Sequence, residues 1–275
     1  MKTEEKVAGH YTRGKLEEAI LGAARTAGKD TAQLTAADLS AVDEFHVGGL
    51  EATQILARGM GLRPGMELLD VGCGIGGPAR YFAGEQGCRV TGIDVTPEFV
   101  QTAESLTKLV KLDGKAIFRQ TSALAMPFAA ESFDGAYMIH VGMNLADKEG
   151  VFREVRRVLK QGARFTIFDL MRAKEGALRF PVPWAVSEET SFVAGAAQYR
   201  AALEAAGFDV EKEQSHQKSS IEFTQRMAAR TRESGPPALG LHILMGEKTP
   251  MMLKNVLDGM VGGVFDVVEM VGKKK

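Results

Sequence analysis

A glycine-rich segment between an apolar run and a proline constrains the fold of this chain most. Residues 66–71 are mostly apolar and predict a strand, residues 72–77 contain four glycines, and residues 78–86 predict a helix that begins with a proline. Glycine lacks a Cβ and adopts positive φ, so such a loop lets backbone N–H groups and a helix N-terminus approach a ligand closely. Proline suits the first turn of a helix. The segment therefore predicts a strand–loop–helix unit built around a ligand.

Strand-like runs and amphipathic helices alternate after this segment. The sequence predicts strands over residues 89–95, 116–119, 135–141, 164–170, 208–213 and 265–271. It predicts helices over residues 97–112, 148–160 and 194–206, helical structure before residue 61 and over 216–262, and a solvated tail over 272–275. Alternation of this kind is typical of a mostly parallel sheet with helices on both faces. We therefore predict a doubly wound α/β fold with additional helices.

The charge balance and the cysteine content exclude several classes of protein. The chain has 34 basic and 35 acidic residues, so its net charge of −1 gives no general attraction for nucleic acid or an anionic membrane. Two cysteines are too few for a disulfide framework or a four-thiolate zinc site, and no cluster has metal-ligand spacing. The charged residues 1–6 do not resemble a signal peptide, and no apolar run is long enough to span a membrane. We expect a cytoplasmic protein that binds a small molecule, without nucleic acid, membrane or metal.

Two aspartates near the glycines indicate the kind of ligand. Asp94 ends the second predicted strand about twenty residues after the loop, where a carboxylate accepts hydrogen bonds from both hydroxyls of a ribose. The loop alone is ambiguous, because Gly72, Gly74 and Gly77 also match the pattern of dinucleotide-binding folds. Asp70 favours a different nucleoside, since its charge repels a pyrophosphate and attracts the ammonium and sulfonium groups of S-adenosylmethionine. These residues favour S-adenosylmethionine and leave a dinucleotide open as the alternative.

Several segments together resemble the motifs of the class I S-adenosylmethionine-dependent methyltransferases. They lie at residues 70–76, 92–96, 122–128 with 131–134, and 155–162. The chain is most similar to the small-molecule branch that includes ubiquinone/menaquinone C-methyltransferases and sarcosine/dimethylglycine N-methyltransferases. The resemblance implies a Rossmann-like sheet of seven strands with the last one antiparallel. It also implies S-adenosylmethionine as the cofactor and S-adenosylhomocysteine as the product.

The same resemblance divides the chain and assigns the cofactor contacts. It implies an N-terminal helical lid over residues 1–62, a cofactor-binding core over 63–171, the rest of the core with a helical substrate cap over 172–262, and the last strand and tail over 263–275. The implied cofactor-binding residues are Tyr11, Asp70, Gly72, Cys73, Gly74, Gly76, Asp94, Val95, Ser122, Ala123 and Leu124. At position 122 many relatives carry an aspartate that accepts from the adenine amino group, whereas Ser122 is a weaker acceptor.

Candidate catalytic residues follow from the positions of two strand ends. Methyl transfer from a sulfonium depends mainly on alignment, and a base is a supplement. His140 and Asp169 end apolar runs that we expect to be neighbouring strands, so Asp169 would orient His140 as a general base for a hydroxyl acceptor. Trp184 and Phe192 would line an apolar substrate pocket. Oxygen is the favoured acceptor, with nitrogen and carbon as alternatives. A nicotinamide-dependent oxidoreductase and a non-catalytic cofactor-binding protein are more distant ones.

Overall fold

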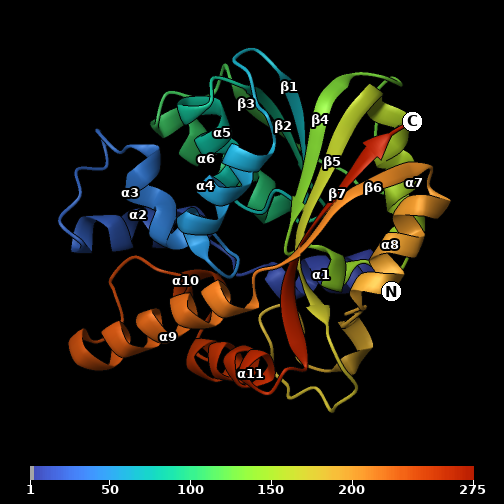
Figure 1. Cartoon of the computed structure of the whole chain (residues 1–275). Coiled ribbons are helices and arrows are strands. Elements are labelled where there is room, and N and C mark those ends of the chain that lie inside the picture. The colour runs from blue at the N-terminus through green and yellow to red at the C-terminus, as the bar shows by residue number, and fades with distance from the viewer. Residues whose placement is uncertain (1–2) are drawn as a thin grey trace.

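Seven strands form one sheet in the order β3-β2-β1-β4-β5-β7-β6, with helices on both faces (Figure 1). The computed structural model describes residues 3–275. The strands are β1 (Glu67–Val71), β2 (Arg89–Asp94), β3 (Ala116–Gln120), β4 (Phe133–Ile139), β5 (Leu159–Arg172), β6 (Phe208–Ser215) and β7 (Phe265–Lys274). The first five strands are parallel, and β7 is antiparallel to both β5 and β6. The predicted α/β fold with an antiparallel last strand is confirmed.

Helices connect the strands and cover the sheet. Before β1 lie α1 (Thr3–Tyr11), α2 (Leu16–Thr26), α3 (Ala36–Asp43) and α4 (Gly49–Gly59). Between strands lie α5 (Gly77–Glu85), α6 (Pro97–Leu109), η1 (Gly142–Asn144), α7 (Lys148–Val158), η2 (Glu188–Thr190), α8 (Ala196–Ala205), α9 (Gln217–Ser234), α10 (His242–Met245) and α11 (Thr249–Val261). Gly235 and Gly246, both at positive φ, follow α9 and α10 and divide the helical stretch predicted over residues 216–262. Within the described chain, none of these helices is long and apolar enough to cross a membrane.

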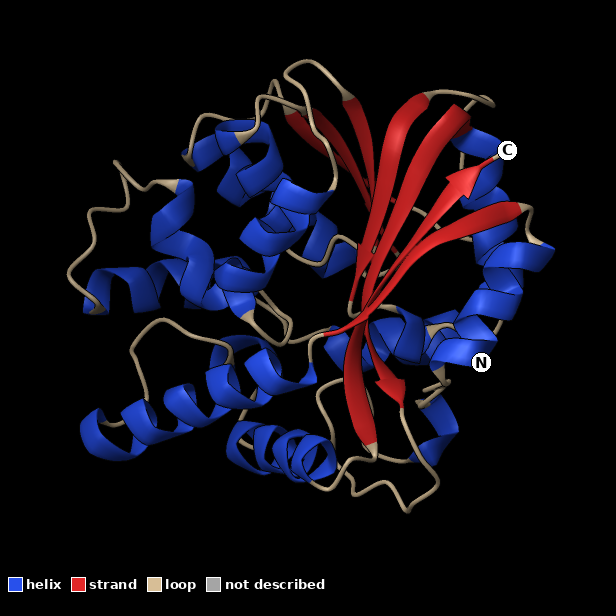
Figure 2. Cartoon of the chain, viewed as in Figure 1, coloured by secondary structure: helices blue, strands red, loops and turns tan. Residues whose placement is uncertain are grey.

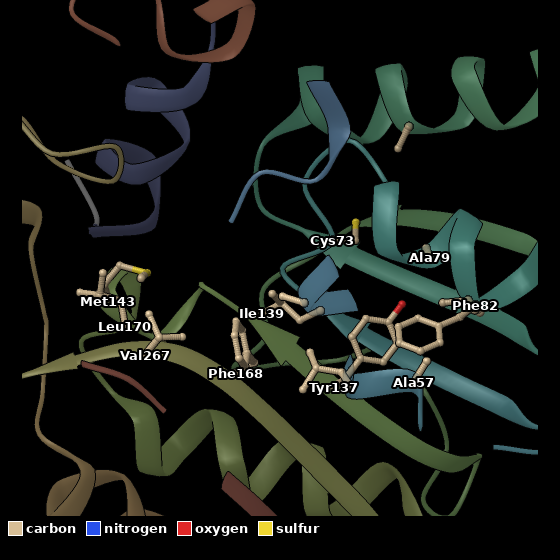
Figure 3. Packing of buried hydrophobic residues seen from close by; sticks show 14 of the residues in the cluster. Ala57, Cys73, Ala79, Phe82, Tyr137, Ile139, Met143, Phe168, Leu170 and Val267 are labelled. Carbon is tan, nitrogen blue, oxygen red and sulfur yellow. The ribbon is translucent and has the colours of Figure 1, made fainter. Parts of the chain in front are cut away.

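Side chains at alternate strand positions pack into a separate core on each face of the sheet. On one face the rings of Phe82 and Tyr137 lie 4.6 Å apart between centroids, close to Ala57 of α4 (Figure 3). On the other face the rings of Phe152 and Phe165 lie 5.5 Å apart. Because successive strand residues point to opposite faces, neighbouring positions of one strand belong to different cores. This alternation also decides where the polar side chains at the strand ends point.

Two strands are longer than the sequence predicts. The helix α7 ends at Val158, so residues 159–162 belong to β5 instead of the predicted helix and its terminating turn. At the other end of the chain, β7 runs to Lys274, whose Nζ donates a hydrogen bond to the carbonyl of Leu159 (2.6 Å). The predicted solvated tail is therefore wrong for residues 272–274, because pairing with β5 and β6 satisfies their backbone groups.

The long strands β5 and β7 carry the sheet beyond the other strands, toward α9 and α11 (Figure 2). Both helices contact β7, and Gln217 at the start of α9 donates from Nε2 to the carbonyl of Met260 (3.0 Å). These helices lie in the region expected to complete the core and cap the substrate. That expectation for residues 172–262 stays a prediction.

Candidate active site

One pocket lies along the carboxyl ends of four neighbouring strands. It is lined by residues 121 and 123 after β3, 94–96 after β2, 70–75 at the end of β1, and 139–141 at the end of β4. The remaining lining residues are Glu4, Val7, Tyr11, Asp43, Phe45, His46, Pro78, Ile93, Phe99, Asn144 and Leu145. Open α/β sheets bind their ligands at this edge. The pocket therefore occupies the place where the sequence predicts a ligand.

Close contacts explain two glycines of the loop after β1. Gly72 has a φ of 76°, and a Cβ at this residue would lie 2.5 Å from Cγ2 of Val141. Gly76 has a φ of 84°, and a Cβ there would lie 2.7 Å from Cζ of Phe118. Gly72 and Gly74 line the pocket, as does Cys73 between them, whereas Gly76 shapes the turn behind it. The loop thus brings backbone to the ligand side and leaves little room for side chains.

Two aspartates face the pocket from β1 and β2. The carboxylate of Asp94 accepts from the N–H of Thr96 at Oδ1 (2.8 Å) and from the N–H of Gly74 at Oδ2 (3.0 Å), and burial raises its pKa. Asp70 is buried and faces the hydroxyl of Tyr137, but in the part of the chain that the structure describes no group lies within hydrogen-bond distance of its Oδ2. Burial, together with the nearby charge of Asp94, raises the pKa of Asp70 to about 8. A cation in the pocket would therefore favour the ionised form of Asp70.

His140 directly follows β4 and adopts the left-handed conformation, with a φ of 54°. Its ring Nδ1 lies 3.3 Å from the carbonyl oxygen of Phe168, and because a carbonyl can only accept, we assign the ring proton to Nδ1. The Nε2 atom is buried and has no partner among residues 3–275. Burial, with His46 as a further contribution, lowers the pKa of His140 to about 3. His140 is therefore neutral, and its buried Nε2 is an unused acceptor on a residue that lines the pocket.

Asp169 does not pair with His140. Its Oδ2 accepts from the N–H of Gly142 and from the hydroxyl of Tyr199, both at 2.8 Å. Strand alternation directs Asp169 toward α8, whereas the His140 ring lies beside Phe168, which packs into the core on the other face. The prediction that Asp169 orients His140 is therefore wrong. Asp169 instead anchors the η1 turn that follows His140, and burial raises its pKa to about 6.

The helix α1 covers the pocket with one face. Glu4, Val7 and Tyr11 share that face because they are three and four positions apart. The hydroxyl of Tyr11 lies 3.1 Å from Nδ2 and 3.3 Å from Oδ1 of Asn144. Tyr11 thus lies in the pocket as the sequence predicts, held by a residue that the sequence analysis did not select.

The predicted residues beyond β2 and β3 occupy different environments. Val95 and Ala123 line the pocket. The hydroxyl of Ser122 donates to the carboxylate of Glu4 and accepts from the N–H of Leu124 (3.1 Å). The side chain of Leu124 is 43% exposed and lies outside the pocket lining. Ser122 therefore reaches the pocket through its contact with α1.

Neither predicted aromatic residue of the substrate wall lines this pocket. Trp184 is only 4% exposed, lies edge-on to Phe265 with 5.9 Å between ring centroids, and donates from Nε1 to Ser191 (2.9 Å). Phe192 is tied to η1 through its carbonyl, which accepts from Nζ of Lys148 (2.7 Å). Trp184 is therefore a core residue.

A buried cluster before and within α4 adds a second imidazole to the pocket. Nε2 of His46 lies 2.8 Å from a carboxylate oxygen of Glu44, and the hydroxyl of Thr53 donates to the same oxygen (2.6 Å). The His46 ring lies 5.9 Å from the ring of His140, measured between centroids. The sequence places His46 in the N-terminal helical region, but its approach to His140 depends on packing between segments that no motif marks.

Sequence comparison finds known relatives of the central part of the chain. Residues 69–167 match the profile described as methyltransferase domain. The sterol 24-C-methyltransferase ERG6B of Gibberella zeae is 40% identical over 42% of this chain and 30% of that protein. The botryococcene C-methyltransferase of Botryococcus braunii is 40% identical over 47% of this chain and 34% of that protein. The chain thus spans about a third of the length of these two curated relatives.

Structural comparison covers the whole chain at low sequence identity. Phosphoethanolamine N-methyltransferase 2 of Haemonchus contortus has a TM-score of 0.76 at 18% identity, covering 100% of this chain and 60% of that one. Geranyl diphosphate C-methyltransferase of Streptomyces coelicolor A3(2) has a TM-score of 0.73 at 17% identity, covering 100% and 98%. The [4+2]-cyclase SpnF has a TM-score of 0.67 at 21% identity, covering 95% of each chain.

Both kinds of comparison include methyltransferases, and they differ in how much of the chain they cover. The profile includes both Asp70 and Asp94 and favours the methyltransferase over the dinucleotide interpretation of the glycine loop. The structural likeness extends the fold to the flanking helices and the antiparallel strand. Residues 69–167 therefore match a methyltransferase domain, and the chain as a whole has the fold of solved methyltransferases, one of them in complex with S-adenosylmethionine.

Proposed function

We propose that this chain transfers a methyl group from S-adenosylmethionine to a small-molecule acceptor. The observation that carries the proposal is the pair of pocket carboxyls at adjacent strand ends. Asp94 at the end of β2 suits two ribose hydroxyls, and Asp70 on β1 has a buried oxygen without a partner in the described chain, which suits an ammonium group. Both lie in the segment that matches the methyltransferase domain.

The other pocket residues also fit this cofactor. A Cβ at Gly72 would clash with Val141, so the backbone of the loop can pass between Val141 and the pocket only because this residue is glycine. Val95, Phe99 and Ala123 supply apolar surface for a purine base. When bound, S-adenosylmethionine supplies a methyl group on a sulfonium, which passes to the acceptor as the carbon–sulfur bond breaks and leaves S-adenosylhomocysteine.

Oxygen is the first candidate for the acceptor atom. The free Nε2 of His140 lies at the end of β4, beside the loop that would hold the cofactor tail. In the proposed reaction Nε2 takes the proton that a hydroxyl acceptor loses on methylation, and then passes it to solvent. Because burial lowers its pKa to about 3, His140 is a weak base, so alignment and exclusion of water supply most of the acceleration.

Carbon is the second candidate, favoured by the sterol and botryococcene C-methyltransferases among the relatives. An apolar acceptor fits the side chains of Phe45 and Ile139, which line the pocket. A screen for release of S-adenosylhomocysteine separates the candidates. Phenols and alcohols support oxygen, and isoprenoid alkenes support carbon. Turnover of amines alone would contradict both assignments.

Calorimetric titration tests the cofactor assignment directly. We expect S-adenosylmethionine and S-adenosylhomocysteine to bind at micromolar concentrations, on the order of 7 to 9 kcal/mol, and NAD to give no heat of binding. Asp94→Ala should weaken binding of S-adenosylhomocysteine by about 1.5–3 kcal/mol, because it removes a charged acceptor. The matched control is Asp113→Ala at an exposed position. Tight binding of NAD without binding of S-adenosylhomocysteine would overturn the proposal.

A further inference from the structure

The lid helix α1 brings a carboxylate to the loop after β3. Glu4, in the first turn of α1, accepts a hydrogen bond at Oε1 from the hydroxyl of Ser122. Glu4 also lines the pocket, together with Thr121 and Ala123. A carboxylate has room for about four hydrogen bonds, so the bond from Ser122 leaves capacity for a second donor. An acidic side chain thus lies beside the position where many relatives have an aspartate and this chain has a serine.

The strand order determines which part of a nucleoside would reach Glu4. In the sheet, β3 lies next to β2 on the side away from β1 and β4. If the ribose hydroxyls bind Asp94 and the charged tail runs to Asp70 at the end of β1, the base lies on the β3 side. The residues on that side are Thr121, Ala123 and Glu4. The edge of the base therefore faces a carboxylate that comes from a distant part of the chain.

We propose that Glu4 binds the exocyclic amino group of the adenine, so that α1 supplies the acceptor that position 122 lacks. This inference rests on the proposed function. An amino group donates to a carboxylate, whereas the carbonyl of a 6-oxopurine would meet it with a second acceptor and be rejected. Ser122 acts as a positioning residue, because its hydroxyl holds Oε1 of Glu4.

The alternative is that the bond between Glu4 and Ser122 only fastens α1 over the pocket. Tyr11, on the same face of α1, already bonds Asn144, so the helix has a second attachment at its other end. A simple fastening would change the affinity for every nucleoside ligand alike. Recognition of the amino group would change the affinity only for ligands that carry it. The two roles therefore differ in a ratio that can be measured.

Calorimetry with two ligands tests this ratio. The first is S-adenosylhomocysteine, and the second is its analogue with hydrogen in place of the 6-amino group. We expect the wild-type chain to prefer the first by about 10- to 100-fold, the usual value of a hydrogen bond to a charged group. Glu4→Ala should reduce this preference to less than about threefold, with little change for the analogue. Adding Ser122→Asp to Glu4→Ala should restore much of the preference.

The control variant is Glu104→Gln, an exposed position on α6, and circular dichroism checks that each variant folds. An equal loss for both ligands in Glu4→Ala would show a fastening role and overturn the inference, while the proposed function stands. The same holds if the wild-type chain binds both ligands equally. If the wild-type chain binds neither ligand, the proposed function and this inference both fail.

Discussion

The two halves of the pocket are built in different ways. One half, the cofactor half, would hold the ribose and the charged tail of the cofactor and comes from residues 70–75 and 94–96, at the ends of two adjacent strands and in the loops that follow them. The other half, the acceptor half, lies around His140 and is bordered by Tyr11, His46 and Asn144, and the bond between Tyr11 and Asn144 spans 133 positions of sequence. Local segments thus fix the first half, and long-range packing fixes the second. Substitutions in the second half should therefore act through its scaffold as well as its chemistry.

The largest expected effect tests where the acceptor half ends. Trp184→Ala should lower the free energy of unfolding by about 3–5 kcal/mol, because it empties a buried site next to Phe265. Urea denaturation measures this loss, and Trp184→Phe, which keeps most of the volume, should lose less. The KM for the acceptor should stay within about twofold in Trp184→Phe. A raised KM for the acceptor with an unchanged free energy of unfolding would show that Trp184 lines the substrate pocket.

The next effect separates chemistry from positioning within the acceptor half. His140→Ala should lower kcat for a hydroxyl acceptor by about 10²-fold, the lower end of the range for a general base, since its low pKa makes it a weak one. The Kd for S-adenosylhomocysteine should change by no more than a few-fold. His140→Gln offers a hydrogen-bond acceptor without the basic nitrogen. If it keeps more than about a third of wild-type kcat, His140 positions the acceptor and does not take its proton.

The smallest effect concerns the cofactor half and depends on pH. Asp70 is mostly protonated below its pKa of about 8 in the free protein, and a bound ammonium favours the ionised form. Affinity for S-adenosylhomocysteine should therefore rise with pH, by up to about tenfold per unit, and level off above pH 8. The groups that face Asp70 are Tyr137, Asp94 and Glu44. Calorimetry at about pH 7 and about pH 8 measures this change in affinity, which stays below about tenfold over that interval, and Asp70→Asn should flatten it.

The same shift affects stability with the opposite sign. The folded pKa of Asp70 lies above its ordinary value of 3.8, so the unfolded chain loses this proton first as the pH rises. The contribution of Asp70 to the stability of the free protein therefore falls between about pH 4 and 8. If the free energy of unfolding of Asp70→Asn depends on pH as it does in the wild type, another group dominates the pH dependence of stability.

The difference between the two halves also explains which residues of the site the sequence predicts correctly. The positions of Asp70, Gly72 and Asp94 follow from the order of strand, loop and helix, which local composition reveals. The pairing of His140 with Asp169 required knowledge of which face each side chain takes. The positive φ of His140 at the strand end changes that face, and a positive φ is uncommon enough in residues other than glycine that the sequence does not predict it here.

Burial also explains why the sequence predicts the wrong surroundings for Trp184 and Lys274. Trp184 follows a proline-flanked segment that is equally compatible with a pocket wall and with a core. Its place against Phe265 depends on β7, which begins 81 positions later in the sequence. Lys274 carries a charge that predicts solvent, but its amine is bound by a carbonyl of β5. In each case a partner distant in sequence overrides the local preference.

The position of β7 between β5 and β6 has a consequence for synthesis of the chain. The edge strand β6 leaves the ribosome before its neighbour, because residues 216–264 must be made first. At about 5–20 residues per second, β6 waits for several seconds without its partner strand β7. Its charged residues Asp209, Glu211, Lys212 and Glu213 discourage pairing with other strands during that interval. The ion pair of Lys273 with Glu211 and that of Lys275 with Asp209 then turn the same charges into contacts of the finished sheet.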